Sequence, residues 1–436
     1  MQILDWNGLD EAGRAAALAR PRMQARSDVE QLARSIIGEV RADGDAALLR
    51  LAARFDRATM NAVQVGAEEF AAAEKVLTAV QIAAIETAID NVTRFHAAQL
   101  AGPLDIETMP GVRCERMFRP IPAVGLYVPA GSAPLPSTVI MTAVPALIAG
   151  CPERVLCTPP APDGRANAAV LVAAKRCGIE KVFKAGGAQA VAAMAYGTAS
   201  VPKVDKIFGP GTALTTAAKQ LVAADPEGAA CDLPAGPSEV LVIADAAANP
   251  AFVAADLLAQ AEHDVLAQAL LVTDSRTLAE AVAVEFSAQL QSLSRGAVLV
   301  QSARNCRAVI VRDIAAALAV SNRYAPEHLI IQTAAPRALL DGVQNAGSVF
   351  LGAWSPESMG DYCSGTNHVL PTYGYARAYS GLSLADFQKR VTVQELTAAG
   401  LVRLGPVAQT LADLEGLDGH ARAVTVRLAT LARGAA

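Results

Sequence analysis

Residues 124–142 read VGLYVPAGSAPLPSTVIMT: a short apolar run, a loop rich in glycine and proline, and a longer apolar run. The first run has the length of a buried strand, and the last run has the length of a buried helix. Three further short runs, at 154–158, 181–184 and 204–208, are also followed by glycine and an alanine-rich segment. Because parallel strands need a crossover helix between them, this series predicts a doubly wound parallel sheet.

A second series of short apolar runs alternates with helical segments after residue 239. The runs lie at 240–244, 269–273, 297–300, 308–311, 328–332 and 348–351. Before residue 99 the periodicity is helical, as in 28–51 and 68–96, and after residue 382 the chain is mainly helical and charged. The expected fold is therefore α/β, with two doubly wound parallel-sheet domains and small helical appendages at both ends.

The composition argues against several classes of partner. It has 436 residues, 53% apolar and 4% aromatic, a net charge of -5, and no segment that concentrates lysine and arginine. Nucleic acid is therefore not expected as a partner. The longest apolar run, 137–151, contains Pro145 and is too short to span a bilayer, so we expect a buried helix there and no membrane partner. Seven scattered cysteines without a C-x-x-C pair, and no visible secretory signal, favour a cytoplasmic location.

The chain has only five histidines, so each can be weighed separately. His96 closes an amphipathic helix beside Phe95 and is expected at the surface. The other four lie in polar segments near the ends of expected strands or helices, where α/β sites are built: His263, His328, His368 and His420.

Two segments offer groups that suit a metal ion. Gln260 and His263 end an apolar helix and share one of its faces, because residues three apart lie on the same side. Asp361 lies in a glycine-rich segment, GDYCSGTNH at 360–368. Imidazole, carboxylate and amide oxygen without a thiolate pair fit a zinc site. Alone, however, Gln260 with His263 is more typical of a solvated helix end, and the Asp361 segment is as typical of a plain turn.

Glu327 precedes the apolar run 328–332, and His328 is the first residue of that run. An acid beside an imidazole suits proton removal from an alcohol and activation of water. The plainer interpretation of this pair is a polar turn at the start of a strand.

Three glycine loops, at 129–134, 186–189 and 209–212, follow expected strands and precede expected helices. That arrangement turns backbone amides toward a phosphate. None of the loops has the G-x-G-x-x-G pattern, so by themselves they indicate a ligand-facing rim and not a dinucleotide site.

Taken together, these segments resemble those of histidinol dehydrogenases, from about Arg26 to Arg427. The stretches that carry the resemblance are long: the segment 124–142, GGAQAVAA at 186–193, DLPAGPSEVLVIAD at 232–245, LLAQAEHD at 257–264, NRYAPEHLIIQT at 322–333 and SPESMGDYCSGTNHVLPTYGYARAYSGLSLADFQKR at 355–390. Because the agreement extends over such lengths, we prefer the functional interpretation of each segment to the plain interpretation given above.

The resemblance implies two incomplete Rossmann-like domains. Their expected boundaries are a helical extension at 1–24, a first α/β domain formed by 25–126 with 240–382, a second at 127–239 on the cofactor side, and a helical dimerisation segment at 383–436.

The resemblance also implies a function: oxidation of L-histidinol to L-histidine through L-histidinaldehyde, with one zinc ion per subunit and two successive hydride transfers to NAD. His328 would remove the hydroxyl proton in the first step, and Glu327 would activate water in the second. The implied zinc ligands are Gln260, His263, Asp361 and His420. The implied substrate contacts are these four residues with Ser238, His328, His368 and Glu415, and the implied NAD contacts are Tyr127 and Gln189. A homodimer with shared active sites is implied, in which His420 completes the neighbouring site.

Two positions depart from the family pattern. Thr212 replaces a usual asparagine, and its hydroxyl lacks the reach of an amide toward the cofactor. Ala130 replaces a usual glycine, which would strain the backbone if a positive φ were needed there.

Three alternatives stay open at this stage. The closest is a zinc and NAD dehydrogenase of the same family that acts on another small polyol or a sulfonated diol. A metal-dependent hydrolase with Glu327 as base, and a binding protein without activity, are the others.

Overall fold

The computed structural model describes residues 1–21, 26–130, 133–234 and 236–434. They form two compact units, one of Met1–Gln99 with Ile121–Phe387 and one of Leu100–Pro120 with Gln388–Ala436. Gly131 and Ser132 of the first predicted glycine loop lie outside the described residues.

The first unit contains a five-stranded parallel sheet in the order β6-β5-β4-β7-β8. Its strands are β4 (Ala123–Tyr127), β5 (Glu153–Thr158), β6 (Lys181–Lys184), β7 (Lys206–Phe208) and β8 (Ala230–Cys231). The crossover helices are α6 (Pro136–Ile148), α7 (Ala168–Arg176), α8 (Gly187–Tyr196) and α9 (Ala213–Ala224). The strand order reverses between β4 and β7, which is where ligands bind in sheets of this kind. The prediction of a doubly wound sheet is confirmed, as is the buried helix in 137–151.

Four helices before this sheet complete its two apolar layers: α2 (Arg26–Asp43), α3 (Asp45–Leu51), α4 (Ala67–Val76) and α5 (Ala79–Ala97). One layer packs α4 and α5 against α6 and α7, and the other packs α2 and α3 against α8 and α9. The expected boundaries assign residues 25–126 to the other sheet, yet these helices cover the five-stranded one. Because both sheets belong to one compact unit, the division between them stays a prediction.

The second sheet of this unit has six parallel strands in the order β1-β11-β10-β9-β12-β13. The strands are β1 (Gln2–Asp5), β9 (Glu239–Ala244), β10 (Gln268–Thr273), β11 (Arg307–Ile310), β12 (His328–Gln332) and β13 (Ser348–Leu351). The helices around it include α1 (Glu11–Ala17), α10 (Pro250–Ala261), α11 (Arg276–Leu290), α13 (Ile314–Tyr324) and α14 (Glu357–Tyr362). A second parallel sheet was predicted, and it is confirmed.

Three local predictions in this unit are wrong. The N-terminal residues, expected to be helical, form β1 at the sheet edge. Residues 297–300 lie in α12 (Gly296–Ser302), because a four-residue apolar run does not distinguish a strand from a helix turn. His96, expected at the surface, is fully buried: Nδ1 lies 2.9 Å from the Val92 carbonyl, and Nε2 lies 3.4 Å from Asn367 Nδ2.

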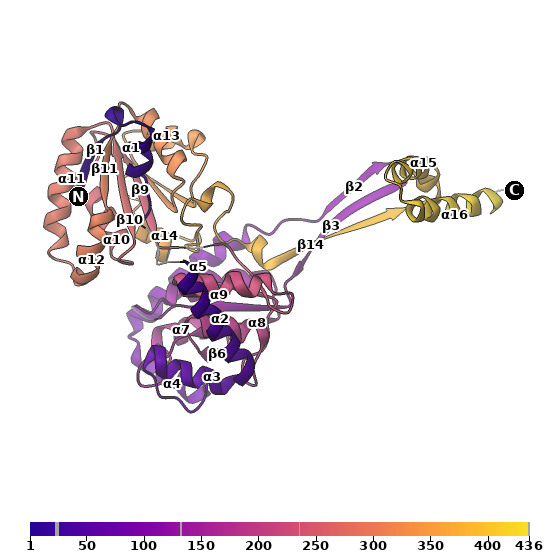
Figure 1. The fold of residues 1–436 in the computed structure, drawn as a ribbon, viewed down its shortest axis with the longest axis horizontal. Coiled ribbons are helices and arrows are strands. Elements are labelled where there is room, and N and C mark those ends of the chain that lie inside the picture. The colour runs from indigo at the N-terminus through magenta and orange to yellow at the C-terminus, as the bar shows by residue number, and fades with distance from the viewer. Residues whose placement is uncertain (22–25, 131–132, 235, 435–436) are drawn as a thin grey trace. The chain divides into compact units, whose positions relative to one another are not determined.

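The second unit combines an antiparallel sheet with two helices (Figure 1). The strands are β2 (Leu104–Met109), β3 (Val112–Pro120) and β14 (Gln388–Leu396), in the order β14-β3-β2, and the helices are α15 (Ala398–Leu414) and α16 (Asp418–Gly434). The C-terminal segment is therefore not purely helical. β14 was missed because most of its residues are exposed, so its sequence shows no buried face.

Among the residues that the structure describes, no helix has both the length and the apolar character that crossing a bilayer requires.

Candidate active site

Gln260 and His263 stand where α10 ends. The helix begins at Pro250, where Asn249 accepts a hydrogen bond from the Ala251 N–H as N-cap, and it packs its apolar face into the second sheet. Gln260 is completely buried, whereas 40% of the His263 side chain is exposed. His263 lies two residues beyond the last residue of α10, and its N–H donates to the Gln260 carbonyl at 3.2 Å, so only the imidazole of the pair reaches solvent.

Two carboxylates approach this helix end from α14. Glu357 is in its first turn and Asp361 one turn later, on the same face of the helix. Glu357 is 1% exposed and Asp361 is 9% exposed. Gly360, between them, lies against Phe350, where a Cβ would come within 2.6 Å of the ring. The short helix is therefore held close to the sheet, with its acidic face turned inward.

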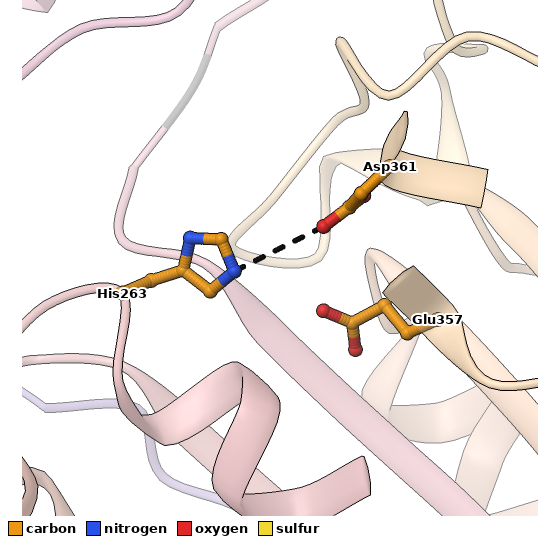
Figure 2. Close-up of side chains that lie close together, drawn as sticks. All are labelled: His263, Glu357 and Asp361. Carbon is orange, nitrogen blue, oxygen red and sulfur yellow. Dashed lines mark ion pairs between the residues drawn. The ribbon is translucent and has the colours of Figure 1, made fainter. Parts of the chain in front are cut away.

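His263, Glu357 and Asp361 form a cluster whose ligand atoms all lie within 4.8 Å of one another. Figure 2 shows the three side chains turned toward a common point. His263 Nε2 lies 3.9 Å from Asp361 Oδ2. Two members of this cluster were predicted as metal ligands. Glu357 was not, although its spacing of four from Asp361 was a usable signal.

The Gln260 amide borders the cluster. Turned so that its nitrogen faces acceptor atoms, the amide donates toward Glu357 Oε1 and Oε2, both at 3.1 Å, the Glu239 carbonyl at 3.2 Å and His328 Nδ1 at 3.0 Å. The amide oxygen then points away from these acceptors. Imidazole nitrogen, carboxylate and amide oxygen are all ligands that zinc accepts, so the residues present fit such an ion.

Glu327 and His328 reach the same place from the start of β12. His328 Nε2 lies 3.5 Å from Asp361 Oδ1, and within the described part of the chain this buried nitrogen has no hydrogen-bond partner. Glu327 Oε2 lies 3.7 Å from His328 Nδ1 and accepts a hydrogen bond from the Glu239 N–H at 2.9 Å. The structure thus brings this pair directly against Asp361.

Burial sets the protonation of several of these groups. Burial lowers the pKa of His263 and that of His368, which favours the neutral imidazoles that bind metals. Burial alone would raise the pKa of Asp361, but the His328 ring 3.5 Å away and its charge lower this pKa to about 2. Burial raises the pKa of Glu327 to about 8.

Ser238, Glu327 and His368 meet at a small cavity beside the cluster. The remaining lining residues are Gly209, Pro210, Gly211, Asp232, Leu233, Gly236, Val369, Leu370 and Thr372. His368 is fixed by its ring nitrogens, with Nδ1 2.8 Å from the Asp361 carbonyl and Nε2 3.3 Å from Thr138 Oγ1. Three of the predicted catalytic or substrate residues therefore share one cavity.

A second cavity opens at the carboxyl ends of β4 and β7. Its lining residues are Asp56, Tyr127, Pro129, Ala133, Leu135, Pro159, Gly187, Thr212, Thr215, His263 and Arg295. The Tyr127 hydroxyl accepts a hydrogen bond from the Gly187 N–H at 2.9 Å, at the start of α8. Because His263 lines this cavity too, the cavity reaches the cluster of His263, Glu357 and Asp361.

Of the two predicted cofactor residues, one lines this cavity and the other is not among its lining residues. Tyr127 lines it, whereas Gln189 is 3% exposed in the first turn of α8, with Oε1 3.3 Å from where a Gly187 Cβ would be. Asp56 and Arg295 also line the cavity, and nothing in the sequence distinguished them.

The two departures from the family pattern have local explanations. Thr212 lines the cavity and is the N-cap of α9, accepting a hydrogen bond from the Thr215 N–H at 3.5 Å. In the described part of the chain, non-glycine residues with positive φ are Arg57, Ala325 and Tyr373. Ala130 is not one of them, so the condition for strain at this position is not met.

Glu415 and His420 belong to the second unit. Glu415 is the C-cap of α15, and His420 is in the first turn of α16. Both side chains are exposed.

Known proteins resemble this chain over nearly its whole length. The histidinol dehydrogenase family model matches residues 18–428. A histidinol dehydrogenase of Vibrio parahaemolyticus is 52% identical over 431 residues, which is 99% of this chain and 99% of the relative. One of Xanthomonas euvesicatoria is 54% identical over 432 residues, which is 99% and 100%. The crystal structure of histidinol dehydrogenase from Elizabethkingia anophelis has a TM-score of 0.95 and 43% identity, and the match covers 99% of this chain and 98% of that one. The chain therefore belongs to the histidinol dehydrogenase family, whose members are oxidoreductases.

Proposed function

We propose that this chain oxidises L-histidinol to L-histidine through L-histidinaldehyde, with zinc and NAD. The observation that carries the proposal is the position of Glu327 and His328, between a metal-binding cluster and a cavity shared with Ser238 and His368. Relatives at 52% and 54% identity bear the name of this activity.

Gln260, His263 and Asp361 would hold the zinc ion, with His420 as the fourth ligand. When bound, zinc supplies a Lewis acid that orients the substrate and polarises its oxygen, and NAD supplies the hydride acceptor. Tyr127, Gln189 and the cavity at the ends of β4 and β7 would hold NAD at the strand-order reversal. Glu415 and Ser238 would contact the substrate.

His328 is the base of the first oxidation. Glu327 Oε2 lies 3.7 Å from His328 Nδ1 and Asp361 Oδ1 lies 3.5 Å from His328 Nε2, so these carboxylates stabilise the imidazolium that forms when the ring takes the hydroxyl proton.

Glu327 is the base of the second oxidation, in which water must add to the aldehyde. Its carboxylate lines the cavity with Ser238 and His368, and the Glu239 N–H fixes one of its oxygens. A pKa of about 8 lies near the working pH, where a general base is most effective.

NADH formation from L-histidinol tests the proposal. The purified chain with zinc should form about two NADH per histidinol, and a chelator should stop the reaction. Other small polyols and sulfonated diols serve as comparison substrates. Turnover of one of these instead of histidinol would replace the substrate, and no turnover with any alcohol would refute the dehydrogenase.

A homodimer with shared sites is part of the proposal, because the family resemblance assigns His420 to the neighbouring site. A Glu327→Gln, His328→Ala chain and a His420→Ala chain should each be inactive. Mixed dimers should regain activity, because one intact site can form from two damaged chains. Proven subunit exchange without any rescue would count against the shared site.

A further inference from the structure

Glu357 is a buried carboxylate to which the proposed mechanism gives no role of its own. It is 1% exposed and sits in the first turn of α14, in the same cluster as His263 and Asp361 (Figure 2). Burying an acidic group costs free energy unless a donor satisfies it. The donor it faces is the Gln260 amide.

The amide of Gln260 has only one favourable orientation at this position. One end of the amide faces both carboxylate oxygens of Glu357 at 3.1 Å, the Glu239 carbonyl oxygen at 3.2 Å and His328 Nδ1 at 3.0 Å. An amide nitrogen carries two hydrogens for these neighbours, whereas with the His328 proton on Nε2 an amide oxygen there would face acceptors alone. Since Gln260 is completely buried, water cannot relieve such a mismatch.

We propose that Glu357 is a positioning residue that holds the Gln260 amide with its oxygen toward the metal ion. This inference rests on the proposed function, because it assumes that Gln260 is a zinc ligand. The amide oxygen can bind a cation and the amide nitrogen cannot, so the orientation decides whether Gln260 serves as a ligand. The Glu239 carbonyl accepts the second hydrogen and supports the same orientation.

A direct bond from Glu357 to the ion is the competing interpretation, since its carboxylate belongs to the same cluster. The two interpretations differ in how Glu357 and Gln260 are coupled. A positioning residue acts through Gln260, so its removal should matter only while Gln260 is present. A ligand would contribute independently of Gln260.

Zinc affinity of the full chain, measured by competition with a chromophoric chelator, separates the two. Loss of a residue that orients a metal ligand weakens binding by about 10- to 100-fold, which is the expected effect of Glu357→Ala. The Gln260→Ala, Glu357→Ala double variant should bind zinc as tightly as Gln260→Ala alone. Additive losses, or no loss in Glu357→Ala, would overturn the proposal.

Two variants control for charge and for folding. Glu357→Gln keeps an oxygen that can accept from the Gln260 nitrogen, so it should bind zinc within a few-fold of the unchanged chain. A loss as large as that of Glu357→Ala would show that the charge matters, and not the acceptor. Asp256→Asn removes a buried carboxylate of α10 that accepts a hydrogen bond from Gln332 Nε2 at 2.6 Å, and it should leave zinc affinity unchanged.

The comparison is independent of turnover. A chain that binds zinc yet forms no NADH would refute the proposed function while leaving the comparison of affinities valid. An unchanged chain that binds no zinc would refute both the zinc site and the role of Glu357.

Discussion

The ion pair between Arg20 and Glu239 should stabilise the first unit strongly. Arg20 Nε donates to Glu239 Oε2 at 2.5 Å and its NH2 group donates to Oε1 at 2.7 Å, with side chains that are 15% and 2% exposed. The Tyr324 hydroxyl lies 3.1 Å from Glu239 Oε2 and 2.8 Å from Gln268 Oε1, so two acceptors share its one hydrogen, and the Arg20 guanidinium lies 4.0 Å from the Tyr324 ring centre. Arg20→Ala would therefore leave a buried carboxylate with one of its two side-chain partners.

Breaking a buried pair costs about 3–5 kcal/mol, because an uncompensated charge remains. Tyr324 still donates, and the slight exposure of Arg20 admits water, so we expect the lower end, about 3 kcal/mol. Urea unfolding followed by circular dichroism measures this loss as a lower midpoint with an unchanged slope.

Two variants test this reasoning. Arg20→Ala with Glu239→Gln removes both charges and should cost less than Arg20→Ala alone. Arg34→Ala breaks an exposed pair with Glu30 and should cost less than about 1 kcal/mol. The reasoning fails if Arg20→Ala costs no more than Arg34→Ala, or if the double variant is the least stable of the three.

Four further outcomes are expected. In stopped-flow measurements of NADH formation, Glu327→Gln should slow the oxidation of supplied histidinaldehyde by about 10²- to 10⁴-fold and the first oxidation far less. Equal losses in the two oxidations would refute the division of roles between Glu327 and His328. Burial lowers the pKa of His96 in the folded state, so as the pH falls the unfolded state binds a proton at His96 before the folded state does. The free energy of unfolding should therefore fall below about pH 6.5, and His96→Gln should flatten this pH dependence in urea titrations. Thr212→Asn keeps an N-cap residue for α9 and adds an amide at the cofactor cavity. In a fluorescence titration NAD should therefore bind about 5-fold more tightly, with the stability of the chain unchanged, and equal or weaker binding would contradict this. Removing zinc with a chelator should lower the midpoint of thermal unfolding and abolish activity, and added zinc should restore both. A ligand at about 100 times its Kd adds about 2.7 kcal/mol to the free energy of unfolding, so an unchanged midpoint would argue against a bound ion.

The parallel sheets were predictable because their strands are buried on both faces. Residues 240–244 and 269–273 contain almost no polar group, and in the structure every residue of β9 and β10 is buried. The same criterion fails for β2 and β14, whose residues are mostly exposed. It also fails for His96, because the helical pattern does not reveal that Phe95 faces outward and His96 inward.

The candidate site was predictable only in its local parts. Gln260 with His263, and Glu327 with His328, are neighbours in the chain, so their pairing follows from spacing. The approach of Glu357 to Gln260 depends instead on how α14 packs against α10, which the sheet order sets. The cavity that joins Asp56 to Arg295 likewise depends on tertiary packing between distant segments.

The pairing of β1 with β11 has a consequence for synthesis of the chain on the ribosome. Gln2 pairs with Arg307, so β1 meets its partner in the described sheet only after some three hundred further residues have been made. At about 5–20 residues per second, that delay is roughly 15–60 s. The five-stranded sheet, formed from residues 123–231, is complete well before then. The nascent chain can therefore bury its first core early, while the edge of the second sheet stays open until β11 arrives.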